Sequence, residues 1–462
     1  MKIALINTNR MQPPIAPIGL DYVAEALAAA EHTVRVLDLC WEQDPRAAIA
    51  QFFKESDFGL VGMTLRNTDD CAFINCQSFL SEFIDLVKAV RNSNNAPIVL
   101  GGVGFSIMPE MVLSLSGADF GVWGDGEFAL AELAKRLEKK QDWQDVPNLL
   151  WQDSGKFRRN PPAWGRLASL PPMSRSWVDN RRYFRHGGQA GFETKRGCPG
   201  ACIYCADPPA KGKQVRLRPP AAVADELEKL LQQGVDVLHT CDAEFNIPEQ
   251  HALQTCGEII QRGLGDRIQW YAYCTPGCFS QGLARSMRKA GCIGINFGVD
   301  NGNDAMLKRL GRDFGSADIL NATARAKKEG MAVMLDLLLG APGETRESVE
   351  QTVELMRKAG PDRVGVAVGV RIYPGTPLNA QTGTTNSFDP AFFLEPEIAP
   401  FVFDWLSELI GEDRRFLFMD PSRPNQNYNY NTNQRLVDAI RRGYRGAYWD
   451  ILRLIEESLQ GG

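Results

Sequence analysis

The chain has 462 residues and a formal net charge of −5, with 44% hydrophobic and 23% charged residues. This length predicts two or three domains, and the composition is typical of a globular protein with large hydrophobic cores. A slightly acidic chain with short basic runs lacks the clustered positive surface of a nucleic-acid-binding protein. No stretch reaches the ~18 consecutive apolar residues that span a bilayer, and residues 1–7 do not form a signal peptide. We therefore expect a cytoplasmic protein without a nucleic-acid partner or a membrane span.

Residues 1–140 alternate strand-like apolar runs with amphipathic helical patterns, starting with residues 2–6 and 19–30. This alternation predicts an α/β domain with a parallel, doubly wound (Rossmann-like) sheet. Ligands of such sheets bind beyond the carboxyl ends of the strands. The candidate binding loops are therefore residues 7–17, 64–70, 101–106 and 124–127.

Residues 141–188 combine paired prolines with scattered tryptophans, which predicts a linker that packs against its neighbours. Residues 189–385 contain a second series of strand and helix patterns, which indicates a partial (βα)₆ barrel of the TIM type. Residues 386–462 predict a small, mainly helical C-terminal unit with an asparagine-rich loop. The expected barrel strands are residues 192–194, 235–240, 268–273, 293–298, 332–338 and 364–370.

Three cysteines, Cys198, Cys202 and Cys205, follow the first barrel strand directly. Thiolates are soft ligands suited to iron–sulfur clusters, and three of them leave one iron of a cubane open. Zinc is the alternative, but structural zinc would require a fourth Cys or His nearby, and Cys241 follows another strand. The total of eleven cysteines also favours metal or redox chemistry over disulfides in a reducing compartment.

The spacing Cys-x₃-Cys-x-Tyr-Cys, with Tyr204 as its aromatic residue, resembles the signature of the radical S-adenosylmethionine (SAM) superfamily. The resemblance covers residues 192–378. It implies a 4Fe-4S cluster on the three cysteines, with SAM chelated to the open iron. Reductive cleavage of SAM, with electrons from an external donor of the flavodoxin or ferredoxin type, would yield methionine and a 5′-deoxyadenosyl radical.

Two polar segments at the barrel mouth resemble the SAM-binding segments of that superfamily. After the second strand, Asp242 or Glu244 is implied to receive the methionine ammonium, because a buried cation requires a paired carboxylate. A structural role for Asp242 remains the alternative. After the fourth strand, Asp300 and Asn301 are implied to contact the ribose.

The turn from Gly340 to Gly343, which includes Pro342, resembles the segment that lies near the adenine in that superfamily. Glycines there permit close approach of the backbone. The alternative is a tight turn in which Glu344 or Thr345 caps the following helix.

The loops of residues 1–140 together resemble a cobalamin-binding domain that precedes many radical SAM barrels. The Asp-x-His-x-x-Gly motif of many cobalamin proteins is absent, and we expect His32 to be a surface turn residue. We expect Arg66 nearest the cobalt, where a cation disfavours a lower ligand; a salt bridge to Asp69 or Asp70 is the alternative. The implied cobalamin-contacting residues are Pro17, Thr64, Arg66, Gly101, Gly102, Ser106, Gly124, Gly126 and Glu127.

With both cofactors, the resemblance implies a C-methyltransferase that acts on an unactivated carbon through the 5′-deoxyadenosyl radical and methylcobalamin. A non-methylating cyclase or rearrangement enzyme, or a non-catalytic module, is the alternative. The substrate is expected to be a small molecule or a peptide. Trp270, Tyr271 and Tyr273 are expected to face either the barrel lumen or the hydrophobic core. The amide and aromatic residues of 427–433 and 443–450 are expected either to cap the barrel and contact the substrate or to stabilise turns.

Overall fold

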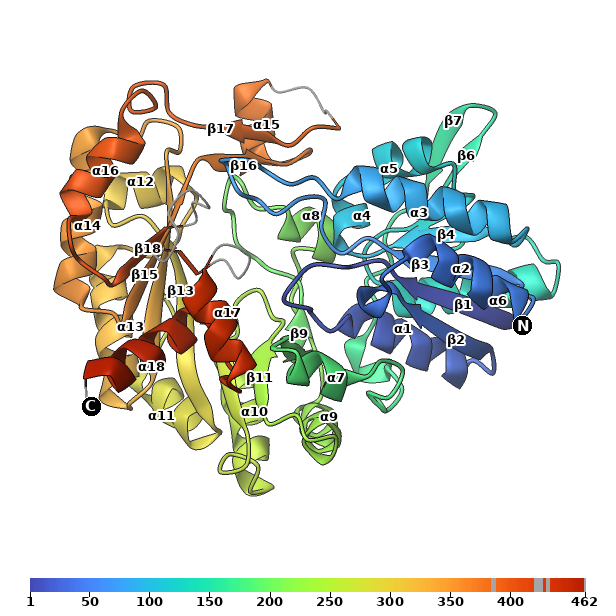
Figure 1. The fold of residues 1–462 in the computed structure, drawn as a ribbon, viewed down its shortest axis with the longest axis horizontal. Coiled ribbons are helices and arrows are strands. Elements are labelled where there is room, and N and C mark those ends of the chain that lie inside the picture. The colour runs from blue at the N-terminus through green and yellow to red at the C-terminus, as the bar shows by residue number, and fades with distance from the viewer. Residues whose placement is uncertain (384–387, 419–426, 429–432, 461–462) are drawn as a thin grey trace.

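The computed structural model describes residues 1–383, 388–418, 427–428 and 433–460. Figure 1 shows two halves side by side: an N-terminal half in blue and a second half in yellow to red, with green segments between them. Each half is built around its own seven-stranded sheet. This agrees with the α/β class expected from the sequence.

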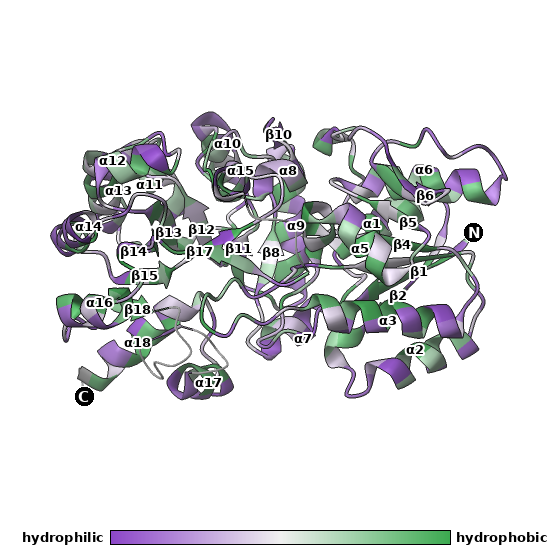
Figure 2. Cartoon of the chain, turned by 90° about the horizontal axis from the view of Figure 1, so that it is seen from above, coloured by the Kyte–Doolittle hydropathy of each residue, from purple (hydrophilic) through white to green (hydrophobic). Residues whose placement is uncertain are grey.

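The N-terminal sheet has the strand order β2-β1-β3-β4-β5-β6-β7. Its first five strands are parallel, and helices cover both faces, as a doubly wound sheet requires. Figure 2 shows α1 and α6 on one side of these strands and α2 and α3 on the other. The strands are β1 (Lys2–Asn7), β2 (Thr33–Asp38), β3 (Leu60–Thr64), β4 (Ile98–Gly101), β5 (Phe120–Val122), β6 (Leu149–Asp153) and β7 (Lys156–Arg159). The helices are α1 (Ile18–Ala29), α2 (Pro45–Lys54), α3 (Leu80–Ser93), α4 (Val103–Ile107), α5 (Pro109–Ser116) and α6 (Gly126–Glu138).

Two features of this domain differ from the sequence prediction. Strands β6 and β7 lie inside the expected linker of residues 141–188, yet β6 pairs antiparallel with β5 and buries Leu149 and Leu150. The sheet therefore extends past residue 140, because burial of these leucines requires a partner strand. The expected loop 101–106 contains the short helix α4, which is followed closely by α5.

The second sheet has the order β18-β15-β14-β13-β12-β11-β8, and all its strand pairs are parallel. Alternate residues face opposite sides: Ile295 and Phe297 pack under the outer helices, whereas Asn296 faces the lumen. The six expected barrel strands are confirmed within a few residues. The strands are β8 (Ala190–Phe192), β11 (Val237–Thr240), β12 (Gln269–Cys274), β13 (Cys292–Asp300), β14 (Ala332–Leu339), β15 (Arg363–Val368) and β18 (Phe416–Phe418).

Helices cover the outer face of this partial barrel. Helix α14 begins at Thr345, whose side chain accepts a hydrogen bond from the Ser348 N–H, and it ends at Gly360 with φ 62°. Two short antiparallel ribbons lie beside the barrel: β9 (Lys195–Arg196) with β10 (Arg216–Leu217), and β16 (Val370–Ile372) with β17 (Ala391–Phe393). The helices of this region are α7 (Asn180–Arg185), α8 (Asp207–Lys211), α9 (Pro220–Gln232), α10 (Glu249–Gln261), α11 (Gln281–Lys289), α12 (Asp304–Arg309), α13 (Ser316–Lys328), α14 (Arg346–Ala359) and α15 (Pro377–Thr382).

The C-terminal residues cover the open side of the barrel. Helices α16 (Val402–Ile410), α17 (Gln434–Arg441) and α18 (Tyr448–Gln460) make this part mainly helical, as expected, although it also supplies β18. Leu436, Ile440 and Trp449 pack on Tyr271 and Met334 from the lumen face of the sheet. In Figure 1, α17 and α18 lie in front of the barrel strands. Within the described residues, no helix is both long and apolar enough to cross a membrane.

Candidate functional site

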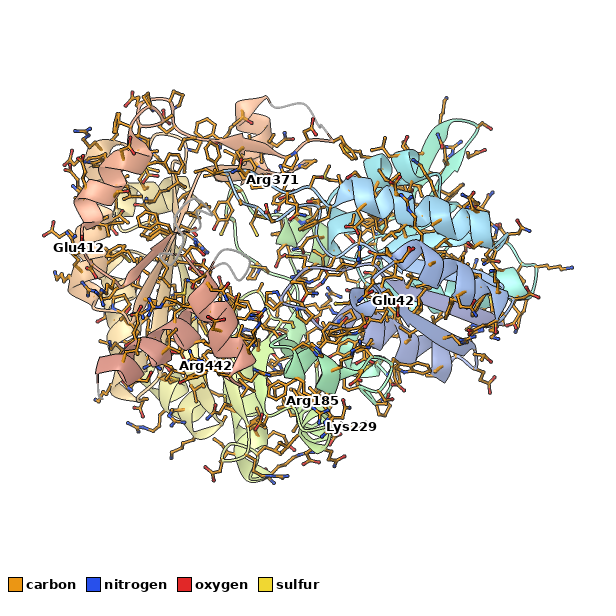
Figure 3. All side chains as sticks on the ribbon, viewed as in Figure 1. Glu42, Arg185, Lys229, Arg371, Glu412 and Arg442 are labelled. Carbon is orange, nitrogen blue, oxygen red and sulfur yellow. The ribbon has the colours of Figure 1, made fainter. Side chains whose placement is uncertain are left out.

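The loops at the carboxyl ends of the two sheets meet each other. Arg371, at the upper contact between the halves in Figure 3, binds Asp69 with Nη2 and Oδ2 at 2.8 Å. Arg196, next to the cysteine loop, binds both carboxylate oxygens of Glu127, with the shorter contact at 2.6 Å. Because parallel sheets bind ligands at this edge, any ligand between the halves has both sets of loops within reach.

A buried ionic cluster fixes one side of this interface. Arg175, in the segment between the two sheets, binds Asp21 of α1 at 2.8 Å and also pairs with Glu226 of α9. Arg218 and the Tyr22 hydroxyl contact the same Glu226 carboxylate, at 2.5 Å and 2.8 Å. The Arg175 side chain is 0% exposed. Such a cluster holds the two halves together only while its charges balance.

The cysteine loop is held by its backbone. Gly197 has φ 88°, and a Cβ there would lie 2.2 Å from the Gln214 carbonyl oxygen, so the turn into Cys198 requires glycine. The Cys198 N–H donates to the Gly212 carbonyl at 3.1 Å, and the Ile203 N–H donates to the Leu310 carbonyl at 3.0 Å. Backbone hydrogen bonds therefore hold both ends of the cysteine loop.

The thiols of Cys198 and Cys202 both lie near Gly200. A Cβ at Gly200 would lie 3.3 Å from Cys198 Sγ and 3.8 Å from Cys202 Sγ. Burial raises the pKa of all three thiols, to about 11 for Cys202 and about 12 for Cys205, so their thiolates require a nearby positive charge. In the described part of the chain no three ligating side chains surround a single ion.

Beside the cysteine loop lies a charged network that sequence reasoning had found only in part. The Tyr204 hydroxyl donates to Asp300 Oδ2 at 2.6 Å, and Arg312 Nε donates to the same oxygen at 2.5 Å. Arg312 also approaches Glu244 at 3.8 Å. Burial raises the pKa of Glu244 to about 7, although the Arg312 charge opposes this shift. Arg312 was not anticipated, because nothing near it in the sequence resembles a motif.

Two other predicted SAM-binding side chains have hydrogen-bond partners within the fold. Asp242 accepts hydrogen bonds from the Thr194 N–H at 2.8 Å and the Thr194 hydroxyl at 2.5 Å, which ties the ends of β8 and β11 together. Asn301 is 0% exposed and donates to Glu344 Oε1 at 2.6 Å. Burial at a barrel end demands that each polar group be paired, and the SAM contacts of both side chains stay predictions.

The polar groups of the turn after β14 hydrogen-bond to one another. The Gly340 N–H donates to Glu344 Oε2 at 2.5 Å, and Gly340 has φ 90°. Thr345 caps α14, so the alternative of a capped tight turn is present. Pro342 lies within this turn, and its contact with an adenine stays a prediction.

In the N-terminal domain, two glycines let the predicted cobalamin loops touch. Cβ atoms at Gly102 and Gly104 would lie 2.4 Å from the Leu65 carbonyl oxygen and 2.9 Å from the Asn67 carbonyl carbon. The Gly104 N–H donates to the Arg66 carbonyl at 2.9 Å, so the α4 segment fixes the backbone of the loop that carries Arg66. Thr64 and Gly101 end the adjacent strands β3 and β4, while Pro17 precedes α1 and Gly126 begins α6.

Arg66 extends towards the barrel. Its guanidinium interacts electrostatically with Cys241, Tyr273 and Tyr448, all outside its own domain, and burial lowers its pKa. The alternative of a salt bridge to Asp69 or Asp70 is wrong for the described residues, because Asp69 pairs with Arg371 and no ion pair joins Arg66 to either carboxylate. The Arg66 guanidinium therefore faces the barrel half and is not paired with Asp69 or Asp70. This position fits the expected place of Arg66 beside cobalamin.

Two further predicted cobalamin-contacting side chains have partners within the fold and stay predictions, whereas the expected surface position of His32 is wrong. The Glu127 carboxylate is 2% exposed and fully occupied by Arg196, so its side chain links the two halves. Ser106 accepts a hydrogen bond from the Gly124 N–H at 2.9 Å, which joins the loops after β4 and β5. His32 is buried against the N-terminal ammonium, with Nδ1 at 3.1 Å, and is therefore no surface residue.

The barrel lumen contains a cavity of about 110 Å³. Tyr271 and Tyr273 face it, whereas Trp270 packs in the helix-side core and donates to the Ala290 carbonyl at 2.7 Å. Most of the predicted asparagine-rich loop lies outside the described residues, but Asn433 caps α17. The lining residues are Gln189, His239, Tyr271, Ala272, Tyr273, Asn296, Asp336, Tyr428, Ala447, Tyr448 and Trp449.

Comparison with known proteins agrees with this architecture. Residues 5–134 match the B12 binding domain and residues 192–367 match the radical SAM superfamily. The chain is 32% identical to a tryptophan 2-C-methyltransferase of Streptomyces laurentii, over 80% of this chain and 73% of the relative. The chain belongs to the cobalamin-dependent radical SAM methyltransferases.

Two further members support the assignment. An uncharacterised methyltransferase of Pyrococcus horikoshii is 28% identical over 78% of this chain and 77% of its own length. The radical SAM methyltransferase TsrM of Kitasatospora setae, solved with tryptophan and a SAM analogue, superimposes with a TM-score of 0.91 at 28% identity and covers 100% of this chain and 98% of that chain. This radical SAM methyltransferase is therefore a C-methyltransferase that uses a 4Fe-4S cluster, SAM and cobalamin and acts on a small molecule. The non-methylating alternative has less support.

Proposed function

We propose that this enzyme methylates the indole ring of tryptophan, or of a close derivative, at carbon 2. The observation that carries the proposal is the extent of the similarity to TsrM, which includes the C-terminal residues that cover the barrel lumen. In this chain those residues help to form an aromatic cavity. A wall that combines aromatic rings with a few polar groups suits one end of an aromatic molecule that bears a polar side chain.

The proposed roles follow from the geometry of this chain's residues. Cys198, Cys202 and Cys205 hold the cluster, and the Glu244 carboxylate receives the ammonium group of SAM. Tyr204 and Arg312 position Asp300 beside them. When bound, the cofactors supply the methyl transfer and radical chemistry that side chains do not perform. Arg66, whose backbone carbonyl accepts a hydrogen bond from the Gly104 N–H, would lie nearest the cobalt.

We further propose that the reducing electrons come from a flavodoxin- or ferredoxin-type donor in the cytoplasm. All eleven cysteines are free thiols, as in a reducing compartment.

We also propose domain boundaries close to residue 160 and residue 189, because these positions fit the ends of the two sheets best.

The function is tested by incubating the reconstituted holoenzyme with tryptophan, a reductant and SAM that carries a trideuterated methyl group. We expect tryptophan to gain one labelled methyl group on carbon 2, detected by mass spectrometry and NMR. Unlabelled tryptophan after full reduction would overturn the substrate assignment. A product modified without the label would instead favour the non-methylating alternative.

The proposed role of Glu244 predicts a pH dependence of SAM binding. Because the pKa of Glu244 is raised to about 7, the carboxylate loses its charge as the pH falls from about 8 to about 6. SAM should therefore bind roughly tenfold more weakly at the lower pH. E244Q should bind SAM weakly at both pH values, whereas E350Q, on an exposed part of α14, should behave like the wild type. An unchanged pH profile in E244Q would contradict the role.

A further inference from the structure

The wall of the lumen cavity contains polar atoms that none of the roles above uses. His239 and Asn296 are each 8% exposed, so both side chains are buried. In the described residues neither ring nitrogen of His239 has a hydrogen-bond partner, and neither do Asn296 Oδ1 and Asp336 Oδ1. Buried polar atoms are normally paired, so this set indicates that a ligand completes it.

Asp336 is the charged member of this set. Its Oδ2 accepts a hydrogen bond from Asn296 Nδ2 at 2.7 Å. The charged group that acts on it is another carboxylate, Asp300, rather than a cation, and together with burial it raises the pKa of Asp336 to about 6. A carboxylate in a barrel lumen without a positive partner is unfavourable, and a ligand that brings a positive charge removes this penalty.

The sheet is adapted to this carboxylate at a neighbouring position. Gly365 of β15 is the registered partner of Asp336 in β14. A Cβ at Gly365 would lie 2.1 Å from Asp336 Oδ1, so only glycine leaves the carboxylate its present place. The absence of a side chain there therefore preserves the polar wall of the cavity.

One residue that lines the cavity, Tyr273, interacts both with Asp336 and with Arg66, the residue expected nearest the cobalt. Tyr273 interacts electrostatically with Asp336 and also with Cys241 and Arg66. A cavity of about 110 Å³ is smaller than the ~150 Å³ site that holds a benzene ring, so it takes only one end of an indole amino acid. With that end beside Asp336, the rest of the molecule extends towards Arg66.

We propose that Asp336 binds the amino group of the substrate and that Asn296 positions the Asp336 carboxylate for this contact. The enzyme therefore selects aromatic substrates that carry a primary amine. The inference rests on the proposed function. Tyr273 and Tyr428 line the same cavity as Asp336, so their rings would be available to the ammonium group. Asp336 is thus a specificity-determining residue.

The test measures binding to the anaerobically reconstituted holoenzyme by calorimetry. The ligands are tryptophan, tryptamine, which lacks the carboxylate, and indole-3-propionate, which lacks the amine. D336N removes the charge of the Asp336 side chain and keeps its shape. G365A displaces the Asp336 carboxylate without removing it. D404N is a matched control on the exposed side of α16. Phenethylamine and 3-phenylpropionate repeat the comparison without an indole.

We expect the wild type and D404N to bind tryptophan and tryptamine with similar affinity and to bind indole-3-propionate about 10- to 100-fold more weakly. D336N and G365A should lose that preference while their affinity for indole-3-propionate is unchanged. D336N must retain its cluster and cobalamin spectrum for the comparison to count. If such a D336N protein still prefers the amine as strongly as the wild type does, the proposal is overturned.

The two hypotheses fail in different ways. If the wild type binds phenethylamine through Asp336 but no indole, the amine site stands and the tryptophan assignment fails. If indole-3-propionate binds as tightly as tryptophan, the indole assignment stands and the amine site is wrong. If no amine binds to the wild type, both are wrong.

Discussion

Replacement of any one of Cys198, Cys202 and Cys205 by alanine is expected to abolish the cluster and reduce methyl transfer below detection. Each thiolate occupies one iron of the proposed cubane, and two thiolates do not retain it stably. The fold should survive, because the loop is held by backbone hydrogen bonds to the Gly212 and Leu310 carbonyls. Iron and sulfide analysis of the reconstituted protein, together with its visible absorption, measures the effect.

The matched control is C278A, because Cys278 is an exposed loop cysteine of the barrel half that lies outside the triplet. It should retain about four iron atoms per chain and wild-type activity. A triplet variant that keeps its iron and activity would show that its thiol is not a ligand. Stoichiometric zinc in place of iron in the wild type would contradict the cluster assignment at these positions.

Substitution of Arg175 by methionine should destabilise the protein by roughly 3–5 kcal/mol, since a buried charge is left without its partner. Asp21 loses its 2.8 Å ion pair, while Glu226 keeps Arg218. The double variant D21N/R175M should recover a large part of the loss, because the amide that replaces the Asp21 carboxylate carries no charge. Urea unfolding followed by circular dichroism measures both values.

The pH dependence of R175M gives a second check. Burial already raises the pKa of Asp21 in the wild type, and removal of the Arg175 charge should raise it further. The folded variant then takes up a proton more readily than the unfolded chain, so its deficit in stability should shrink as the pH falls. R46A, which breaks an exposed pair with Asp85, should change stability by at most about 1 kcal/mol at any pH. A pH-independent deficit would point to lost packing instead of an uncompensated charge.

The sequence predicted the barrel well because its strands are long and apolar and alternate with clear helices. The expected strand 332–338 became Ala332–Leu339, for example. Strand β18 was missed because Phe416–Phe418 is three residues long and becomes a strand only by pairing with β15. Strands β6 and β7 were read as linker because nearby prolines outweighed the short apolar start of β6, and β7 is charged and exposed.

The candidate site was predicted less completely, because its partners are distant in the sequence. Asp242 and Glu244 look equivalent in a loop, and only the contacts of Asp242 with Thr194 separate them. The pairing of Arg196 with Glu127 joins positions on different domains and has no local signal. Asn296 and Asp336 did have a local signal in the sequence. Each is a polar residue within a mostly apolar buried strand, which indicates a polar lumen.

The late position of β18 in the chain has a consequence for biosynthesis. Its partner β15 ends at Val368, whereas β18 starts at Phe416, so the ribosome must add roughly 50 more residues, over several seconds, before that edge is paired. During this interval the nascent barrel presents an unpaired, apolar strand and an uncovered lumen. Interrupted synthesis in this window would release chains prone to edge-to-edge association.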